Sequence, residues 1–503
     1  MIQMKVKYQN RVGILHAAED ETIMQALKRE DILLAAPCYG MGFCKKCKVK
    51  VHGKEVLACQ TKVEDNMEVE LISTFCSMSV LDAFLYEEQE QVVVEHGYYV
   101  AIDLGTTTLV LQLIQAKEDG EKHILQTVKA MNEQSVLGAD VISRITASNA
   151  GERERLQHMI LNQISQNIDV MCTNAGIKVE EVTEVVIAGN TTMIHLLLGW
   201  DTKNLGRYPF EPVSLEWQEY TLGELIGNEL QTKVTIFPGF SAFVGGDITA
   251  GLYALDFAKK NEVNLFLDFG TNGEMAIGNK EKILVTSTAA GPAFEGGNLS
   301  CGVGAISGAI KEVKMKPRYF TYQTIDNQPA IGICGSGVVD LIAELGTNQY
   351  MDEHGTLKEM YREGIVVATT QKGAKKEVRF LQEDVRQMQL AKAAIRSGIE
   401  ILMQTYGVEE HQIKHLYLAG GMGFSLNIEN ACQIGLIPEE LKERVVSVGN
   451  SCLGGVYQYL GQGKQEREKV DAIKEVTTHL QLAEKEQFSN EYLKYMDFNF
   501  KRK

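Results

Sequence analysis

Proline, tryptophan and basic charge are all scarce in this sequence. Its 503 residues include 8 prolines and 2 tryptophans, and 50 Lys and Arg stand against 66 Asp and Glu, which gives a formal net charge of −16 at pH 7. This acidic surplus argues against nucleic-acid binding, which needs a basic face. With 45% hydrophobic residues, the composition excludes a disordered or fibrous chain. The length exceeds what one hydrophobic core supports, so we expect at least two domains.

Long apolar runs are missing as well. No stretch approaches the ~18 consecutive apolar residues of a membrane span, and residues 1–30 lack the basic start and apolar run of a signal peptide. We therefore predict a cytoplasmic protein that binds neither membrane nor nucleic acid. The P-loop pattern and the Rossmann Gly-x-Gly-x-x-Gly pattern are also absent from the sequence. Any nucleotide site must therefore belong to another class.

The ten cysteines are unevenly placed. Four of them fall between Cys38 and Cys59, and the other six are dispersed. A secreted disulfide framework would not be concentrated in this way, so metal ligation is the better interpretation. For four of the dispersed cysteines, in glycine-rich or apolar surroundings, we predict buried and inert thiols. These four are Cys301, Cys334, Cys432 and Cys452.

Strand and helix patterns surround the cysteine-rich loop in the first hundred residues. The expected strands are 4–8, 12–16, 48–51 and 67–72, and the expected helix is 21–30. A polar turn at residues 9–11 separates the first two strands, and Gly53 marks a later turn. The order strand, strand, helix, cysteine loop, strand, strand is that of a β-grasp ferredoxin.

The cysteine spacing predicts a [2Fe–2S] cluster. Cys38, Cys44 and Cys47 form a C-x5-C-x2-C loop, and Cys59 follows on the next hairpin as the expected fourth ligand. The loop is one residue longer than the plant-type C-x4-C-x2-C, a variant that is familiar in adrenodoxin-like ferredoxins. A structural zinc site is the alternative, although zinc ribbons usually carry two C-x2-C pairs and this segment has one. Cys76 is a less favoured fourth ligand, because Cys59 stands at a strand end.

Two later segments share one pattern, a buried strand that ends in Asp, a Gly-Thr turn and a second strand. Residues 98–114 carry it first and residues 263–278 repeat it, with Asp103 and Asp268 165 residues apart. Glycine lets a hairpin backbone approach a triphosphate, while N–H groups and Thr hydroxyls donate to its oxygens. Each aspartate is suited to hold Mg²⁺, directly or through water. The expected phosphate-binding residues are Gly105, Thr106, Thr107, Thr108, Gly270, Thr271, Asn272 and Gly273.

A third glycine motif follows the strand 414–419, at Gly420, Gly421 and Gly423. By itself it indicates no more than a tight turn from strand to helix. Together with the two hairpins, it resembles the actin, Hsp70 and sugar-kinase superfamily. The resemblance implies a duplicated ribonuclease-H-like ATPase domain that closes a cleft on ATP and Mg²⁺, with the three glycines at the adenosine.

Two further turns belong to the same pattern. Asn190 and Thr191 follow a predicted strand and are further candidates for contact with the nucleotide. Asp247 opens a predicted helix and is a candidate for orienting Mg²⁺ or the attacking water. For Asn190, Asp247 and Glu295, helix capping or sheet packing is an equal alternative.

We therefore predict a multidomain chain of class α/β and α+β. The predicted parts are a ferredoxin-like β-grasp domain at 1–78, a linker at 79–97 and an ATPase domain at 98–503, with halves at about 98–260 and 261–470 and a C-terminal tail. Residues 200–231 hold few chemical motifs and suit either a partner-facing insertion or a surface subdomain.

In combination these motifs resemble the ATP-dependent reductive activators of corrinoid proteins. The similarity spans nearly the whole chain and includes residues 132–145, after the first hairpin. Some relatives carry an extra domain between cluster and ATPase, where this chain has room for a linker. Others carry C-terminal cysteine clusters, and no cysteine follows Cys452 here.

The resemblance implies a partner and a reaction. The partner is a corrinoid (cobalamin-type) methyl-carrier protein, whose inactive Co(II) state is reduced by one electron to Co(I) while ATP is hydrolysed. An upstream low-potential electron donor and a homodimer are further implications. The residues alone leave three alternatives open: an ATP-dependent electron donor to another metalloenzyme, a small-molecule kinase with a redox-sensing cluster, and a non-catalytic Hsp70-like clamp. A kinase would need a base for the substrate hydroxyl, and the sequence offers no convincing sugar-binding set.

Overall fold

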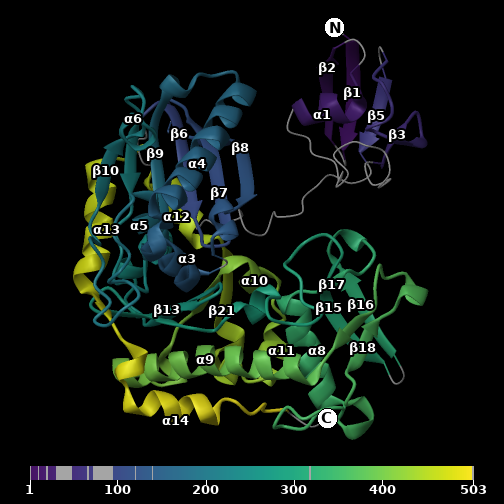
Figure 1. Ribbon diagram of the computed structural model, residues 1–503, viewed down its shortest axis with the longest axis vertical. Coiled ribbons are helices and arrows are strands. Elements are labelled where there is room, and N and C mark those ends of the chain that lie inside the picture. The colour runs from purple at the N-terminus through teal and green to yellow at the C-terminus, as the bar shows by residue number, and fades with distance from the viewer. Residues whose placement is uncertain are drawn as a thin grey trace. The chain divides into compact units, whose positions relative to one another are not determined.

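The computed structural model describes most of the chain. The described residues are 2–8, 11–18, 21–29, 48–64, 67–71, 95–118, 120–138, 140–316 and 319–500. They form two compact units, one of residues 1–77 together with 169–178 and a larger one that contains both six-stranded sheets (Figure 1). Within these ranges, no helix has the length and apolar character needed to cross a bilayer.

The N-terminal unit is a five-stranded sheet with one helix. Its elements are β1 (Ile2–Tyr8), β2 (Arg11–Ala17), α1 (Ile23–Arg29), β3 (Lys48–Val51), β4 (Lys54–Leu57) and β5 (Met67–Leu71). The strand order is β2-β1-β5-β3-β4, in which β1 and β5 run parallel and the other neighbours antiparallel. Alternation along β1 buries Met4 and Val6 against Ile23 and Leu27, which share one face of α1. The predicted β-grasp fold is thus confirmed.

The larger unit is built on two six-stranded mixed sheets. The first has the order β10-β11-β9-β6-β7-β8 and consists of β6 (Gly97–Leu104), β7 (Thr108–Ala116), β8 (Lys122–Met131), β9 (Val182–Gly189), β10 (Gln218–Thr221) and β11 (Lys233–Ile236). The second has the order β21-β20-β12-β13-β14-β22 and consists of β12 (Asn264–Phe269), β13 (Gly273–Gly278), β14 (Ile283–Thr288), β20 (Leu416–Ala419), β21 (Val445–Gly449) and β22 (Thr477–His479).

The two sheets repeat one topology. Three antiparallel strands are followed by a parallel fourth and a parallel fifth, in the spatial orders β8-β7-β6-β9-β11 and β14-β13-β12-β20-β21. The registers match as well, because Asp103 on β6 lies opposite Ala188 on β9, and Asp268 on β12 lies opposite Ala419 on β20. The duplicated ribonuclease-H-like fold predicted from the two Asp-Gly-Thr segments is confirmed.

The helices cover these sheets and join them. They are α3 (Val141–Ala147), α4 (Arg153–Ala175), α5 (Thr191–Leu197), α6 (Leu222–Ile226), α7 (Gly246–Ala254), α8 (Gly335–Thr347), α9 (Gln382–Tyr406), α10 (Gly420–Ser425), α11 (Ile428–Gln433), α12 (Ser451–Tyr459), α13 (Lys464–Val476) and α14 (Glu486–Lys494). Helices α7 and α12 pack along each other, and the core around them combines Val186 of the first sheet with Phe266 and Val285 of the second. One continuous apolar core therefore connects the two halves.

The C-terminal end of helix α12 is hydrogen-bonded to the first sheet. The Lys122 ammonium on β8 donates to the carbonyl oxygens of Tyr457 (2.8 Å) and Gln458 (3.0 Å), and the Tyr457 hydroxyl donates to the Lys122 carbonyl oxygen (3.0 Å). A cation at this position also complements the negative end of the helix dipole.

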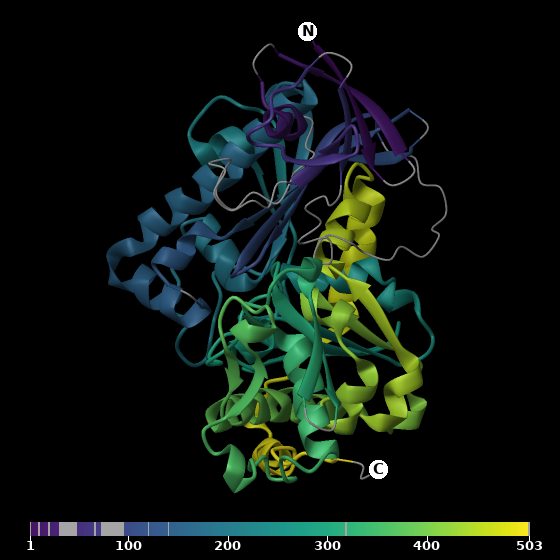
Figure 2. The same cartoon turned by 90° about the vertical axis from the view of Figure 1, so that its right-hand side faces the viewer.

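The rest of the chain extends the second half. Helix α13 packs on α7, and the chain then returns to lay α14 along α9 (Figures 1 and 2). Two small sheets complete this half, with the orders β16-β15-β17 and β18-β19. Their strands are β15 (Ala309–Lys316), β16 (Tyr319–Thr324), β17 (Gly332–Ile333), β18 (Ile365–Ala368) and β19 (Val378–Phe380).

Candidate functional site

The first predicted hairpin is a tight turn between β6 and β7. The Gly105 N–H donates to the Thr108 carbonyl oxygen at 3.0 Å, which closes the turn around Thr106 and Thr107. A Cβ atom on Gly105 would stand 2.7 Å from that same oxygen, so the turn needs glycine. Asp103 precedes the turn at the end of β6 and is half-buried. The turn residues and Asp103 therefore share one edge of the first sheet.

The turn after β9 is tied to this hairpin. Asn190 caps α5 by accepting the Met193 N–H at 3.0 Å, and its amide donates to the Thr106 hydroxyl at 2.9 Å. The Thr191 hydroxyl instead donates to the Ser241 carbonyl oxygen at 2.6 Å, and its side chain is buried. The structure thus brings Asn190 to the hairpin and uses Thr191 to hold the loop before α7.

The second hairpin, between β12 and β13, has a turn that is one residue shorter and more acidic surroundings. The Gly270 N–H donates to the Asn272 carbonyl oxygen at 3.0 Å, and the Thr271 hydroxyl donates to the Glu295 carboxylate at 2.7 Å. Glu274 follows on β13, directly opposite Asp268. Gly273 begins β13, where a Cβ atom would stand 2.0 Å from the Ile395 side chain of α9. The end of the Ile395 side chain would have to move to admit a side chain at this position.

The third glycine motif lies beside the second hairpin. Gly420 has φ +81°, and a Cβ atom there would stand 2.4 Å from the Phe269 carbonyl oxygen and 2.7 Å from the Asp268 carboxylate. Gly421 and Gly423 continue into α10. Strand β20 therefore ends in close contact with Asp268, which a larger residue at 420 would displace.

Four carboxyl groups crowd together where the two halves meet. Burial is the first cause of the raised pKa of each, and for Asp247, Asp268 and Glu274 the charges of neighbouring carboxylates add to it. The pKa of Asp268 rises to about 8 through burial and the charges of Asp247 and Asp103, and the pKa of Asp247 rises to about 7 through burial and the charge of Asp103. Burial, and then the charges of Asp247 and Asp268, raise the pKa of Glu274 well above its usual value. Burial also raises the pKa of Asp103, against the opposing effect of its hydrogen bonds with Asn450 and Cys452. Repelling carboxylates of this kind mark cation and catalytic sites.

This carboxyl cluster fits hydrated Mg²⁺. In the part of the chain that the structure describes, no three His, Cys, Asp or Glu side chains stand close enough to coordinate one ion directly. Mg²⁺ keeps much of its water and needs few direct protein ligands when phosphate oxygens are present. Carboxylates that repel each other across a shared space suit an ion held through its water shell.

Asn450 is a site residue that the sequence patterns missed. It caps α12 by accepting the Leu453 N–H at 2.8 Å, while its amide donates to the Asp103 carboxylate at 2.7 Å. Asn450 follows the fifth strand of the second half at the start of α12, as Asp247 follows the fifth strand of the first half at the start of α7. Extending the internal repeat to the fifth strand would have found it.

The dispersed cysteines are buried, as predicted, but one of them lies at this site. Cys301, Cys334, Cys432 and Cys452 are all buried free thiols. Cys452, two residues after Asn450, also hydrogen-bonds to Asp103. Burial, and then the charges of Asp103 and Asp247, raise the pKa of the Cys452 thiol well above its usual value, so it stays protonated.

Of the predicted cluster ligands, the structure describes Cys59. It is buried in the turn after β4, where the Gln60 N–H donates to the Leu57 carbonyl oxygen at 2.9 Å. The Met24 N–H of α1 donates to the Ala58 carbonyl oxygen at 3.0 Å, which fixes this turn against the helix. The loop cysteines Cys38, Cys44 and Cys47, and the alternative Cys76, lie outside the described residues.

Three family models match the chain in succession. Residues 14–74 match a 2Fe-2S iron-sulfur cluster binding domain, residues 98–260 match the RACo middle region, and residues 262–502 match the C-terminal domain of RACo, the ASKHA domain. Over 560 aligned residues the chain is 31% identical to the corrinoid activation enzyme RamQ of Eubacterium limosum, covering 91% of this chain and 92% of that protein. This chain belongs to the RACo family.

Other RACo relatives agree. A reductase of the Co(II) methylated-amine-specific corrinoid protein of Methanosarcina barkeri is 25% identical over 79% of this chain and 76% of its own length. The solved structure of a reductive activator for a corrinoid, iron-sulfur protein superposes with a TM-score of 0.73 at 26% identity, covering 99% of this chain and 98% of that one. The chain is therefore an activator of RACo type that combines a [2Fe–2S] domain with an ASKHA ATPase domain, and its cofactors are the cluster and ATP.

Proposed function

We propose that this chain reactivates a corrinoid methyl-carrier protein by reducing its cobalt from Co(II) to Co(I), with hydrolysis of ATP. The observation that carries the proposal is the pairing of an N-terminal cluster-binding domain with two matching Asp-Gly-Thr hairpins that bring their carboxylates together in one unit. One electron passes from an external low-potential donor to the protein and on to cobalt. One ATP and one water become ADP and phosphate.

For the electron carrier we propose the four thiolates of Cys38, Cys44, Cys47 and Cys59 as ligands. A [2Fe–2S] centre held there supplies one-electron transfer, at a potential near roughly −400 mV for the plant type. The family resemblance implies that Co(II) in a corrinoid is harder to reduce. Each ~59 mV of gap is then a tenfold equilibrium penalty for one electron. The energy of ATP binding and hydrolysis is available to offset it.

For the nucleotide we propose that the two hairpins hold its phosphates and that the glycines after β20 receive its adenosine. The residues in this role are Gly105, Thr106, Thr107, Thr108, Asn190, Thr191, Gly270, Thr271, Asn272, Gly273, Gly420, Gly421 and Gly423. Asp103 and Asp268 would hold Mg²⁺ through its water shell, and Asp247 would orient the attacking water. Burial and the charge of Asp103 raise the pKa of Asp247 to about 7 without the ion, which suits it to accept a proton from that water near neutral pH.

The deciding experiment is anaerobic absorption spectroscopy. A Co(II) corrinoid protein is mixed with this protein and a low-potential reductant, with and without Mg-ATP. The expected result is a Co(I) band that grows when ATP is present and does not grow with Cys59→Ser or Asp268→Asn. Cys301→Ser is the matched control, because it replaces a buried thiol outside both sites.

Two outcomes would redirect the proposal. Reduction at the same rate without nucleotide would remove the ATP coupling. No Co(I) with several carrier proteins and an intact cluster would favour another low-potential metalloenzyme as partner. A homodimer, the identity of the electron donor and a cytoplasmic location stay predictions.

A further inference from the structure

Arg144 is a fully buried cation without an acidic partner in contact. It lies on α3, is 0% exposed, and donates to the carbonyl oxygens of Gly138 (2.8 Å) and Thr106 (2.6 Å). Its remaining contacts are the Gln134 amide oxygen at 3.4 Å and the Met193 sulfur at 3.0 Å. No described carboxylate forms an ion pair with it. Burying a charge in this way costs several kcal/mol unless an opposite charge compensates it.

The nearest acid does not supply that compensation. Asp140 acts on Arg144 through space, but it is exposed and caps α3 by accepting the Ser143 N–H at 2.8 Å. Burial, the larger effect, lowers the pKa of Arg144 to about 10. The guanidinium therefore keeps its charge at neutral pH and lacks a counter-charge of its own.

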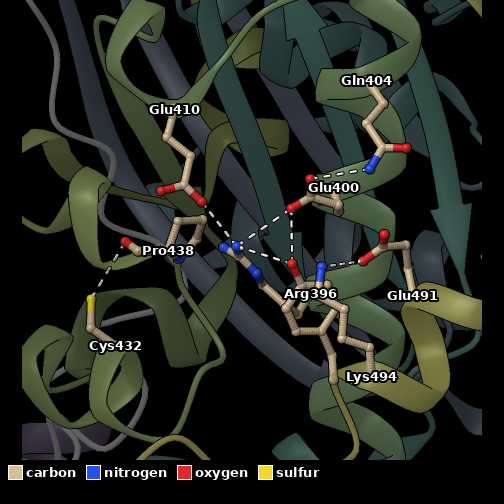
Figure 3. A network of polar contacts seen from close by, with 9 residues as sticks. Arg396, Glu400, Gln404, Glu410, Cys432, Pro438, Glu491 and Lys494 are labelled. Carbon is tan, nitrogen blue, oxygen red and sulfur yellow. Dashed lines mark hydrogen bonds and ion pairs between the residues drawn. The ribbon is translucent and has the colours of Figure 1, made fainter. Parts of the chain in front are cut away.

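Arg396 shows what a buried arginine has elsewhere in this protein. It is 8% exposed on α9, and its guanidinium donates to Glu410 at 2.9 Å and to Glu400 at 3.5 Å (Figure 3). Two carboxylates thus neutralise one cation. Arg144 is buried more deeply and has carbonyl, amide and thioether contacts in their place. A missing counter-charge, and not burial itself, sets Arg144 apart.

The first hairpin turns its carbonyl groups toward Arg144 and Asn132. The Asn132 amide donates to the Gly105 carbonyl oxygen at 2.9 Å, and Arg144 donates to that of Thr106. The Asn132 N–H donates to the Thr107 carbonyl oxygen at 2.9 Å. In a trans peptide the N–H points opposite to the C=O. The next N–H groups along the turn therefore point away from Asn132 and Arg144, and successive N–H groups of this kind form an anion-binding concavity.

We propose that Arg144 is a positioning residue of the nucleotide site whose missing counter-charge is the phosphate chain of ATP. This rests on the proposed function, since it takes the first hairpin as a phosphate-binding turn. The guanidinium donates to the Thr106 carbonyl oxygen and polarises that peptide group. The N–H of the same peptide, which points away from Arg144, thereby becomes a stronger hydrogen-bond donor. Its charge also acts through the turn on the phosphates, so its effect grows with the number of phosphate groups.

The test is a comparison of nucleotide affinities in full-length variants. Arg144→Gln is expected to weaken ATP binding at least about tenfold, in line with loss of a charged hydrogen-bond donor, with a smaller loss for ADP and little change for AMP. Arg144→Lys keeps the charge and should retain most of the preference for ATP. Asn132→Asp is nearly isosteric, removes one carbonyl donor and adds a negative charge, so it should lower ATP affinity in the same graded way.

Arg444→Gln is the matched control. Arg444 also donates to backbone carbonyl oxygens, those of Glu410, His411 and Ile413, and lies away from the hairpins. It should lower the melting temperature of the free protein without changing the rise in melting temperature that ATP produces. Equal losses for ATP, ADP and AMP in both the Arg144→Gln and Asn132→Asp variants would overturn the inference and leave Arg144 a structural residue. Failure of the unaltered protein to bind Mg-ATP would instead overturn the proposed function.

Discussion

The hairpin between β6 and β7 sets Asp103 beside the Asn450 amide and rests its turn on the buried cation Arg144. In the hairpin between β12 and β13, Asp268 lies opposite Glu274, and the Thr271 hydroxyl donates a hydrogen bond to the Glu295 carboxylate. The two hairpins occupy the same place in their sheets, but four residues separate the paired Leu104 and Leu109 and three separate the paired Phe269 and Gly273. The charge behind each turn differs as well, positive for the first and negative for the second.

This difference in charge suggests how the two halves of a duplicated fold can contribute differently to binding one nucleotide. A triphosphate with its magnesium ion is an anion and a cation together, and a site with two identical halves would suit one of them. In the proposed function both hairpins hold phosphates and both Asp103 and Asp268 hold the ion, but the cation behind the first turn favours phosphate oxygens and the carboxylates around the second favour the ion.

The largest effect is expected for Asp268→Asn. It removes a carboxylate from the acidic hairpin, so the ion loses its main attraction, and ATP hydrolysis should fall at least about a hundredfold. The measurement is phosphate release at saturating Mg-ATP. Asp326→Asn, at an exposed position in a remote turn, is the control and should be unchanged. A loss below about threefold would contradict the assignment of the ion to the second hairpin.

Substitution by alanine should have unequal effects at the two turn glycines, Gly105 and Gly270. A Cβ atom at Gly105 would stand 2.7 Å from the Thr108 carbonyl oxygen, whereas the nearest atom to one at Gly270 is the Asn272 carbonyl oxygen at 3.6 Å. Gly105→Ala should therefore cost about 1–3 kcal/mol of strain and weaken ATP binding, while Gly270→Ala should be close to neutral. Calorimetric titration of both variants with ATP measures the difference. Equal effects would mean that the second turn is as tightly constrained as the first.

Asn450→Asp tests the contact between the halves. Aspartate still caps α12, but it cannot donate to Asp103 and it adds another negative charge. We expect ATP hydrolysis to fall about tenfold, with most of the loss recovered at high Mg²⁺ because the extra charge needs a cation. Asn427→Asp makes the same change at the cap of α11, where Asn427 accepts the Asn430 N–H. If both variants lose activity equally, Asn450 acts through its cap alone.

The smallest effect concerns pH. The folded-state pKa values of Asp247 and Asp268 are raised to about 7 and about 8, so both carboxyls bind protons that Mg²⁺ must displace. The Mg²⁺ concentration for half-maximal activity should fall as the pH rises from about 6 to 9, because ionised carboxylates bind the ion better. Without Mg²⁺, the stability that the protonated carboxyls provide is present below about pH 4 and is lost as the pH rises from there to about 8, because the unfolded state releases those protons at the ordinary Asp pKa of 3.8.

Asp247→Asn sharpens this pH prediction. The charge of Asp247 helps to raise the pKa of Asp268, so its removal should lower that pKa and move the whole Mg²⁺ profile to lower pH. Stability is followed by thermal denaturation at several pH values, with and without Mg²⁺. A profile that keeps its position in the variant would show that the two carboxyls do not interact.

The sequence predicted those parts of the site that depend on contacts between residues close in the chain. It did not predict the parts that depend on contacts between distant residues. The Asp-x-Gly-Thr turns are local, because the atoms closest to their glycines belong to residues two or three positions further along the chain. Their repetition in the sequence predicted the duplicated fold. Asn450 meets Asp103 across 347 residues, and Arg144 meets the Thr106 carbonyl, which any residue could supply. Extending the internal repeat to the fifth strand would point to Asn450, but no sequence pattern records which residue either side chain contacts. Cys452 was predicted to be a buried thiol and is one, yet its neighbour Asp103 could not be inferred from its apolar surroundings.

Helix α12 comes from the second half of the chain yet is secured to the first sheet at both ends, by Asn450 on Asp103 and by Lys122 on its last carbonyl groups. If the two halves rock against each other, α12 is therefore expected to move with the first half. Gly449, the last residue of β21 with φ +74°, would then be one place where the backbone dihedral angles change. Amide exchange that changes with nucleotide should concentrate at residues 447–450, and α12 should respond together with β6.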